Sequence, residues 1–452
     1  MSEFGLFREK MVGAGLGEAA IGAFERGYAL LVSGKKGMMG EESLEPAGEV
    51  PSYGDVVEGK GEWEAARLAE TVVVKLNGGL GTGMGLQKAK SLLKVKGGET
   101  FLDLIVEQVV RLREVTGARV RFLLMNSFST SEDTLAALAG GPLEGEGVEM
   151  LQNKVPKIDA ATMSPVVWEA NEENEWCPPG HGDLYPALVG SGWLEKLLES
   201  GVKYAFVSNS DNLGATLDAG LLNWFAGSGA PFAMEVTRRT EADKKGGHLA
   251  VRKEDGRLVL REVAQCPEED LESFQDVGRH RFFNTNNLWL NLEALKAELE
   301  ASGGVLPLPV IQNAKTVDPR DQSSPRVWQL ETAMGAAIEC FEGAVAVEVP
   351  RSRFAPVKTT SDLFALRSDA YEKREDGSVG LVAVRNGVPP VVKLSSEYKL
   401  VDAMERLGAV PSLVGAETIE VEGVVKFEEG VVVKGEVRFE DTGEVGEGEY
   451  GG

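Results

Sequence analysis

The sequence is poor in the residues that build disulfide frameworks and metal clusters. Its 452 residues include three cysteines and three histidines. Cys177, Cys266 and Cys340 are odd in number and far apart, which argues against a disulfide framework and against a C-x-x-C metal site. With so few histidines, a multi-histidine metal site is also disfavoured.

Positive charge and long apolar runs are scarce as well. Asp and Glu outnumber Lys and Arg by 71 to 47, and the formal net charge is −24. This balance argues against binding to nucleic acid or to anionic membranes. No run approaches the roughly 20 apolar residues of a membrane span, and the N-terminus lacks the apolar core of a signal peptide. We therefore expect a cytoplasmic protein without nucleic-acid or membrane partners.

The most informative segment that is present runs from residue 71 to residue 91. Residues 72–74 are three valines, a β-branched run typical of a buried strand. Five glycines follow between residues 78 and 85, and Lys88 and Lys90 end the loop with positive charge. Strand, glycine-rich loop and lysine together indicate a phosphate-binding loop. Neither the dinucleotide fingerprint nor a Walker loop fits this spacing.

Residues 76–85, Leu-Asn-Gly-Gly-Leu-Gly-Thr-Gly-Met-Gly, resemble the signature of the eukaryotic-type UTP–glucose-1-phosphate uridylyltransferases, also called UDP-glucose pyrophosphorylases. The similarity continues, in order, over roughly residues 70–370. The resemblance implies nucleotide-binding roles for Leu76, Asn77, Gly78, Gly79 and Lys90. In one respect the chain departs from the family: Lys88-Ala89 stands where Gly-Pro is usual. The spacing from Leu76 places the catalytic role on Lys90, and a share of the phosphate contact by Lys88 stays open.

Two further segments match the part of the family that binds the nucleotide base. Gln152 stands where the family reads the uracil edge, and an amide offers both a donor and an acceptor to a base. Residues 178–183, Pro-Pro-Gly-His-Gly-Asp, match the family motif in full. By resemblance, Gly180 lies against the base and His181 against the sugar phosphate.

A third match indicates a metal ligand. Residues 207–214 end an expected strand with Asp211, which is where α/β nucleotide enzymes hold a divalent cation. On spacing alone, an aspartate that caps the next helix fits equally well. The resemblance assigns Asp211 to Mg²⁺ near the α-phosphate, as a nucleotide-binding residue, and Asn209 to the sugar phosphate.

The remaining matches concern the sugar and a second lysine. Asn286 lies in an asparagine cluster at residues 284–287, and the family uses this position for sugar hydroxyls. Residues 349–362 nearly reproduce a family signature, with Ala355 in place of leucine, and they give Lys358 the role of the second nucleotide-binding, catalytic lysine. Segments 245–247 and 329–331 match more weakly.

The element pattern predicts an α/β fold. Thr100 is positioned to cap a helix that Gly117 ends, and residues 120–125 and 204–208 read as buried strands. We expect a helical lead-in over residues 1–70 and a catalytic domain over residues 71–365. By resemblance, the catalytic domain is a nucleotidyltransferase (Rossmann-like) mixed-sheet core.

The last part of the chain has a different period. Apolar residues recur every six positions in two series between residues 419 and 439. This repeat predicts that residues 366–452 form a left-handed parallel β-helix, and an antiparallel meander is the alternative. A packing or assembly domain of this kind is a candidate for homo-oligomer formation.

The resemblance implies a uridylyltransferase that makes UDP-glucose and diphosphate from UTP and glucose 1-phosphate by in-line attack on the α-phosphate. The alternative is the same reaction on another sugar 1-phosphate, as in a UDP-sugar or UDP-N-acetylhexosamine pyrophosphorylase. Asn77 speaks against the acetylhexosamine branch, where alanine is typical. A nucleotide-sugar-binding regulator without activity is the alternative from a different class.

Overall fold

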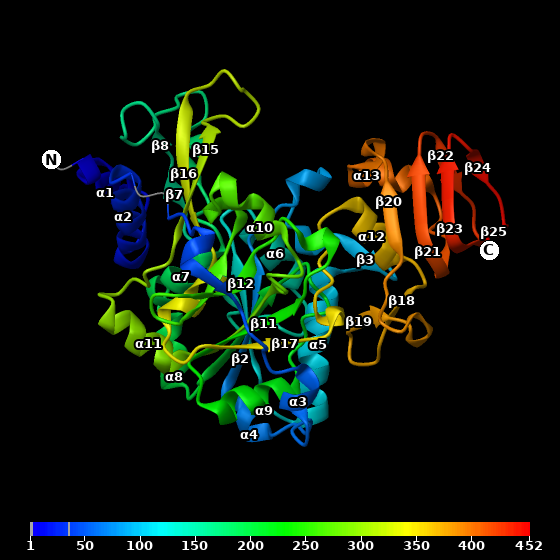
Figure 1. The fold of residues 1–452 in the computed structure, drawn as a ribbon, viewed down its shortest axis with the longest axis horizontal. Helices are drawn as coiled ribbons and strands as arrows, with labels where there is room; N and C mark the ends of the chain where they lie inside the picture. The colour runs from blue at the N-terminus through cyan, green and yellow to red at the C-terminus, as the bar shows by residue number, and fades with distance from the viewer. Residues whose placement is uncertain (1–2, 35–36) are drawn as a thin grey trace.

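The computed structural model describes residues 3–34 and 37–452 (Figure 1). A central sheet with helices on both faces lies between an N-terminal helical pair and a C-terminal group of parallel strands. No helix in these described ranges is long and apolar enough to cross a membrane. The three cysteines are buried and free.

The central sheet has ten strands and is mixed, as predicted. Its main path runs β1-β12-β14-β10-β2-β5-β6, with β11, β13 and β17 attached at β14, β12 and β11. Strands β10, β2, β5 and β6 are parallel, whereas β14 is antiparallel to β10. The bounds are β1 Leu44–Pro46, β2 Thr71–Asn77, β5 Arg121–Asn126, β6 Glu149–Leu151, β10 Tyr204–Asn209, β11 Phe232–Arg238, β12 His248–Arg252, β13 Leu258–Arg261, β14 Phe282–Asn291 and β17 Val345–Glu348.

Alternate residues of β2 point to opposite faces, and each face has its own core. Val73 packs with apolar residues of α5 and α9, while Val72 and Val74 pack with those of α7, α8 and α11. A strand buried on both sides needs apolar residues throughout, which explains the valine run. The helices are α5 Phe101–Thr116, α6 Ser131–Leu138, α7 Leu184–Gly190, α8 Trp193–Glu199, α9 Ala219–Ser228, α10 Leu271–Gln275 and α11 Leu292–Ala301.

Local signals placed the ends of α5 correctly. Thr100 Oγ1 accepts a hydrogen bond from the Asp103 N–H, and the Asp103 carboxylate accepts one from the Thr100 N–H, which forms a capping box. Gly117 ends the helix with a φ of 66°, in the left-handed region that glycine adopts without strain.

The N-terminal segment contains helices and one strand of the central sheet. Its helices are α1 Glu3–Gly13, α2 Glu18–Val32, α3 Tyr53–Val57 and α4 Ala65–Ala69. Helices α1 and α2 share a core with Val155, Val310 and Leu330. These residues belong to β7 Val155–Pro156, which pairs with β9 Trp176–Cys177, and to the small sheet β15 Val310–Thr316, β16 Arg326–Thr332 and β8 Ile158–Asp159. Strand β1 joins the central sheet beside β12, so this segment is continuous with the central sheet.

The C-terminal strands pair in parallel, which excludes the antiparallel meander. Val437 lies opposite Ile419 and Phe439 opposite Val421, an offset of three six-residue repeats. Their elements are β20 Val391–Leu394, β21 Ser412–Glu422, β23 Val431–Glu440 and β25 Gly448–Gly451, with β22 Val425–Phe427 paired to β24 Gly443–Val445. The connecting elements are α12 Thr360–Arg367, β18 Tyr371–Lys373, β19 Val379–Leu381 and α13 Val401–Met404, and β3 Lys94–Lys96 pairs with β4 Glu99–Thr100.

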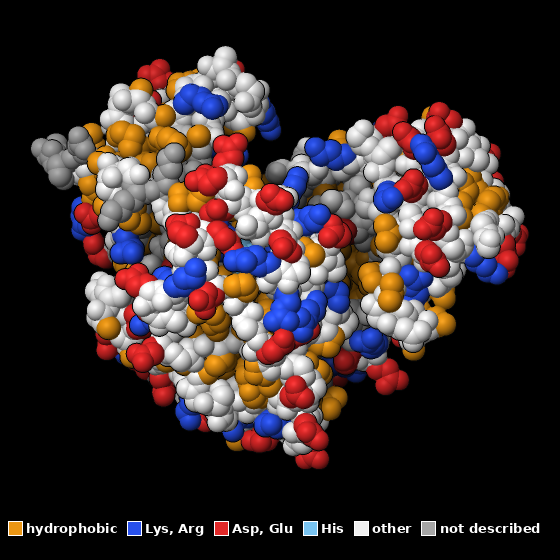
Figure 2. All heavy atoms as spheres, in the orientation of Figure 1, with side chains coloured by type: hydrophobic (Ala, Val, Ile, Leu, Met, Phe, Trp, Pro, Cys, Tyr) orange, Lys and Arg blue, Asp and Glu red, His pale blue; other side chains and the backbone are white. Residues whose placement is uncertain are grey.

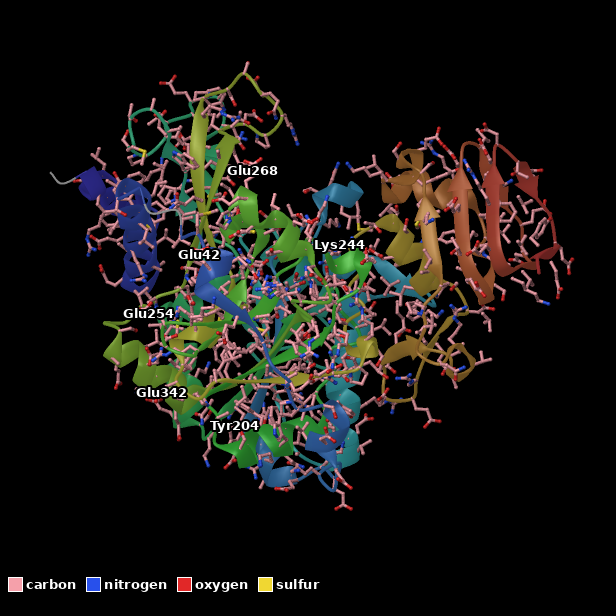
Figure 3. The ribbon with its side chains drawn as sticks, viewed as in Figure 1. Glu42, Tyr204, Lys244, Glu254, Glu268 and Glu342 are labelled. Atoms are coloured by element: carbon pink, nitrogen blue, oxygen red, sulfur yellow. The ribbon has the colours of Figure 1, made fainter. Side chains whose placement is uncertain are left out.

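The sheet directs its parallel strands toward one edge. Tyr204, the first residue of β10, lies at the bottom of the view, and Lys244, in a loop near the opposite edge, lies above it (Figure 3). On the face shown in Figure 2, Lys and Arg side chains are interspersed among Asp and Glu, and the molecule is hollowed between the β15–β16 hairpin and the C-terminal strands. The loops that follow the parallel strands are therefore the place to look for a ligand site.

Candidate active site

The glycine-rich loop begins directly after β2. Gly81 and Gly85 have φ angles of 66° and 80° and flank the short turn Thr82–Met84, so a residue with a side chain would be strained at either position. The Lys90 N–H donates to the Gly79 carbonyl at 3.0 Å. This bond folds the loop back, so that Lys90 lies beside the start of the loop.

The two residues before the glycines hold the end of β2 in place. The buried Asn77 side chain donates to Asn126 Oδ1 at 2.7 Å and to Thr134 Oγ1 at 3.0 Å, and so joins β2 to β5 and α6. The Leu76 carbonyl accepts from the Ser210 N–H at 3.1 Å. The Asn77 side chain thus supports the scaffold, and the nucleotide-binding roles of Leu76, Asn77, Gly78 and Gly79 stay predictions.

Lys90 and Asp211 are in direct contact. The distance from Lys90 Nζ to Asp211 Oδ2 is 2.6 Å. Asn209, two residues earlier, is the last residue of β10 and pairs with Leu76 of β2. Lys88 points elsewhere, with its Nζ 4.0 Å from Asp133 Oδ1 and its side chain 74% exposed. Of these two lysines of the loop, Lys90 is therefore the one that lies beside Asp211.

The segment that carries Lys358 is tied to the loop after β10. The Val357 N–H donates to the Asp211 carbonyl at 3.1 Å. The Asn212 side chain accepts from the Ala355 N–H and donates to the Arg353 carbonyl, both at 3.0 Å. The residue next to Lys358 is thus bonded to Asp211, although Lys90 and Lys358 are far apart in the sequence.

Two arginines of this segment, Arg351 and Arg353, hold it in place. Arg353 Nε and Nη2 donate to the two carboxylate oxygens of Glu235 at 2.8 and 2.7 Å, in a fully buried pair. Arg351 forms a similar two-bond contact with Asp243, at 2.8 and 2.9 Å. Paired hydrogen bonds of this kind fix the geometry of both partners and compensate their charges, so these arginines position the segment.

Gln152 and Gly180 are in direct contact, and their base-binding roles stay predictions. Gln152 Nε2 donates to the Gly180 carbonyl at 2.9 Å. A Cβ atom at Gly78 would lie 2.7 Å from Gln152 Oε1, and one at Gly180, where φ is 80°, would lie 2.5 Å from the Thr332 carbonyl. Gly180 thus requires glycine, and a side chain at Gly78 would displace the Gln152 amide.

Asp183 holds this arrangement together. Its carboxylate accepts from the Asn153 N–H at 2.6 Å and from Asn153 Nδ2 at 3.1 Å. Burial raises the pKa of Asp183 to about 7, although the Asn153 hydrogen bonds act in the opposite direction. The sequence motif contained Asp183 without showing this positioning role.

His181 is a neutral, oriented ring. Its Nδ1 accepts from the Met334 N–H at 3.0 Å, so the ring proton lies on Nε2. Burial lowers the pKa of His181 to about 4. At neutral pH the side chain therefore offers an uncharged N–H donor.

A cavity of about 260 Å³ brings together Gly180, His181, Asn286 and Lys358. Asn286 has a φ of 59° at a bulge of β14, and its Oδ1 accepts from Asn284 Nδ2 at 2.9 Å. The left-handed backbone at the bulge turns the asparagine cluster toward the cavity. The other residues that line the cavity are Gly246, Gly247, Glu262, Phe283, Asn284, Ile311, Glu331, Thr332 and Ala333.

Glu262 is a candidate site residue that the sequence did not reveal. Burial raises the pKa of this carboxyl, and the charge of Lys358 acts to lower it. A Cβ atom at Gly247 would lie 2.5 Å from Glu262 Oε1, so the carboxylate is packed against a glycine of the cavity wall. No motif surrounds Glu262 in the sequence, and only the three-dimensional contact identifies it.

The site offers few protein ligands for a metal. Within residues 3–34 and 37–452, no group of three or more His, Cys, Asp or Glu side chains could hold an ion. Asp211 provides one carboxylate, partly exposed beside Lys90. Mg²⁺ is commonly held by one or two carboxylates, with phosphate oxygens and water completing the octahedron, so the residues present fit this ion.

Comparison with known proteins identifies the relatives of this chain. A family model described as UTP–glucose-1-phosphate uridylyltransferase matches residues 23–434. The enzyme of that name from Solanum tuberosum is 42% identical over 374 residues, which cover 82% of this chain and 76% of the relative. The one from Saccharomyces cerevisiae is 42% identical over 375 residues, which cover 82% and 74%.

Solved structures are similar to this chain over nearly its whole length. A mutant UDP-glucose pyrophosphorylase from Leishmania major in complex with UDP-glucose superimposes with a TM-score of 0.91 at 45% identity, covering 99% of each chain. A protein from Trypanosoma brucei gives a TM-score of 0.89 at 47% identity, covering 99% of this chain and 98% of its own.

Proposed function

Since the chain belongs to the UTP–glucose-1-phosphate uridylyltransferase family, we propose that it converts UTP and glucose 1-phosphate to UDP-glucose and diphosphate, reversibly. The observation that carries the proposal is the convergence of Lys90, Asp211 and the Lys358 segment at the carboxyl ends of β2 and β10. The UDP-glucose complex of the Leishmania major relative supports the same product.

The reaction needs positioning and charge neutralisation more than acid–base chemistry. A phosphate oxygen of glucose 1-phosphate attacks the α-phosphorus of UTP in line, the bond to the β-phosphate oxygen breaks, and diphosphate leaves. The nucleophile is already anionic, so no general base is required. Lys90 and Lys358 neutralise charge at the transferring phosphate, and the amides of the glycine loop orient the nucleotide.

Asp211 is the proposed Mg²⁺ ligand. When bound, the ion would neutralise phosphate charge next to the reacting phosphorus. In the structure Lys90 is bonded to this carboxylate, and it would pair with phosphate oxygens once the ion takes its place.

The side-chain amide of Gln152 is proposed to bind the base through one N–H and its carbonyl oxygen. One N–H of Gln152 is bonded to Gly180, which leaves the second N–H and Oε1 for a ligand. These groups match the O4 acceptor and the N3–H donor of uracil. We therefore expect UTP to be preferred over ATP and GTP.

The sugar phosphate is proposed to occupy the 260 Å³ cavity and its opening. His181 offers a neutral donor, and Asn286 an amide. Glu262 and Glu331 add carboxylates suited to accept hydrogen bonds from sugar hydroxyls. Asn209 lies at the end of β10, where it is proposed to face the sugar phosphate.

The proposed domains are the lead-in 1–70, the catalytic domain 71–365 and a left-handed β-helix 366–452. The three-repeat offset between its parallel strands supports the β-helix, since each turn of three sides would return a residue above its counterpart. Homo-oligomer formation through this domain and a cytoplasmic location stay predictions from the sequence.

A substrate panel tests the proposal. Diphosphate release is measured from UTP with glucose 1-phosphate, galactose 1-phosphate, xylose 1-phosphate and N-acetylglucosamine 1-phosphate, with ATP and GTP as alternative nucleotides. The highest kcat/KM is expected for UTP with glucose 1-phosphate. The proposal fails if diphosphate is not released with this pair, or if another sugar gives a higher kcat/KM.

A further inference from the structure

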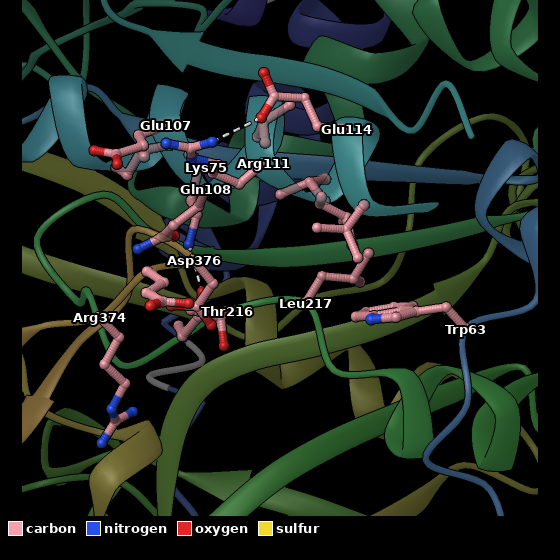
Figure 4. Close-up of a pocket in the computed structure, with 17 residues that line it drawn as sticks. Trp63, Lys75, Glu107, Gln108, Arg111, Glu114, Thr216, Leu217, Arg374 and Asp376 are labelled. Carbon is pink, nitrogen blue, oxygen red and sulfur yellow. Dashed lines mark hydrogen bonds and ion pairs between the residues drawn. The ribbon is translucent and has the colours of Figure 1, made fainter. Parts of the chain in front are cut away.

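A second large cavity lies away from the candidate active site. It has a volume of about 640 Å³ and lies between α5, the loop at residues 215–217 and the turn at residues 374–376 (Figure 4). It shares no residue with the 260 Å³ cavity. Sites for small organic ligands typically have volumes of about 300–1,000 Å³, so this cavity is large enough for one.

The walls of the cavity are mainly apolar. Ile105, Val109 and Leu112 of α5 form one side, and Trp63 and Leu217 also line it. Figure 4 shows the indole of Trp63 close to Leu217. Aliphatic and aromatic side chains of this kind suit a planar apolar group.

The inner wall of the cavity contains a buried lysine, Lys75. Lys75 lies on β2, is 2% exposed and lines the cavity. Its Nζ donates to Ser208 Oγ at 2.7 Å and to the Ala215 carbonyl at 2.6 Å. An ammonium group has three donors, so one donor is not used by these two hydrogen bonds, and the Phe206 ring centroid lies 5.9 Å from Nζ. Neither partner is an anion, and the nearby Glu235 carboxylate is bonded to Arg353.

The mouth of the cavity carries both acidic and basic side chains. Arg111 pairs with Glu114 at 3.0 Å, drawn as a dashed line in Figure 4, and Glu107 pairs with Lys373 at 2.6 Å. Arg374 lies in the exposed turn with two acidic neighbours, residues 375 and 376. Water and salt screen these exposed charges, so the buried Lys75 determines which ligand charge is preferred.

We propose that this cavity is a second ligand site, for an organic anion whose apolar ring system lies between α5 and Trp63 and whose carboxylate binds Lys75. Burial lowers the pKa of Lys75 to about 7, with the charge of Arg353 adding to the effect and Glu235 opposing it. A bound carboxylate raises this pKa again, so binding takes up a proton. Affinity is greatest below pH 7 and declines as the pH rises through the pKa of the complex.

The probe is 2-naphthoate, compared with its neutral isostere 2-naphthamide by isothermal titration calorimetry of the full chain. One molecule of 2-naphthoate is expected to bind, about tenfold (about 1.4 kcal/mol) more tightly than the amide, because the charged carboxylate forms the stronger hydrogen bond with Lys75. At pH 8, titrations in two buffers of different ionisation enthalpy are expected to show proton uptake. Saturating UDP-glucose is not expected to displace the probe.

Three variants identify the site. Lys75→Met should remove the preference for the anion, and Leu217→Trp should fill the cavity and prevent binding of both compounds. Val167→Trp, at an exposed position outside the cavity, is the matched control and should bind as the unaltered chain does. Circular dichroism checks that each variant folds. If Lys75→Met does not fold, the proton uptake by the unaltered chain and the loss of binding in Leu217→Trp test the proposal. Absence of saturable binding, equal affinity for the amide, or displacement by UDP-glucose overturns the proposal.

Discussion

Replacing Lys90 with methionine separates a catalytic role from a structural one. Methionine keeps most of the side-chain length and removes the charge that lies 2.6 Å from Asp211, in a pair whose members are 14% and 20% exposed. A group that neutralises charge developing at a transferring phosphate typically contributes ~2–4 kcal/mol. We therefore expect kcat to fall about 10²–10³-fold, and KM for UTP to rise.

The matched control is Lys88→Met, in the same loop and with the same change of charge. Lys88 is 74% exposed and lies 4.0 Å from Asp133, and such pairs contribute ~0–1 kcal/mol. Its kcat should change by less than about twofold. Diphosphate release gives kcat and KM, and thermal unfolding shows that both variants remain folded. The reasoning is refuted if Lys90→Met keeps most of its kcat, or if Lys88→Met loses as much.

Three further predictions follow from the site. Gln152→Ala should raise KM for UTP by about tenfold or more, since an unpaired base contact costs ~1–3 kcal/mol, and unchanged nucleotide kinetics would remove Gln152 from the site. Asp211→Asn should abolish activity at ordinary Mg²⁺ while the fold persists, and near-normal rates that do not respond to added Mg²⁺ or Mn²⁺ would refute the assignment. Burial raises the pKa of Asp183 from 3.8 to about 7 in the folded chain, so its contribution to stability is present below about pH 4 and is lost as the pH rises from there to about 7. Thermal unfolding between about pH 4.5 and 7 should therefore depend less on pH in Asp183→Asn, and identical slopes would contradict this.

The sequence was most informative where a local rule decides the structure. The Thr100 cap, the Gly117 end of α5 and the strands at residues 71–77 and 204–209 follow from short patterns. The period of six residues likewise predicted the parallel pairing near the C-terminus. Each of these signals lies within one segment, so it can be read without the rest of the fold.

Contacts between distant segments carry no such signal. The buried pair of Arg353 and Glu235 joins residues far apart in the chain, and neither neighbourhood reveals the other. The same holds for β1, which joins the sheet beside β12, and for Glu262 at the cavity. Asn77 illustrates a different difficulty. Its segment resembles a nucleotide-binding loop, yet its side chain supports the junction of β2, β5 and α6.

Under the proposed roles, the pairing of Lys90 with Asp211 would let a chain with a net charge of −24 present a cation to phosphate groups. In the structure each of the two side chains compensates the charge of the other, which limits the cost of partial burial. A triphosphate with its cation offers both of them new partners of the required sign, phosphate oxygens for Lys90 and Mg²⁺ for Asp211. Charge is conserved in that exchange, so the site can be organised before the substrate arrives without a large excess of positive charge. Loss of either partner should then disturb the other. In chemical denaturation, the double variant of Lys90→Met and Asp211→Asn should therefore lose less unfolding free energy than the sum of the two single losses, and additive losses would refute the coupling.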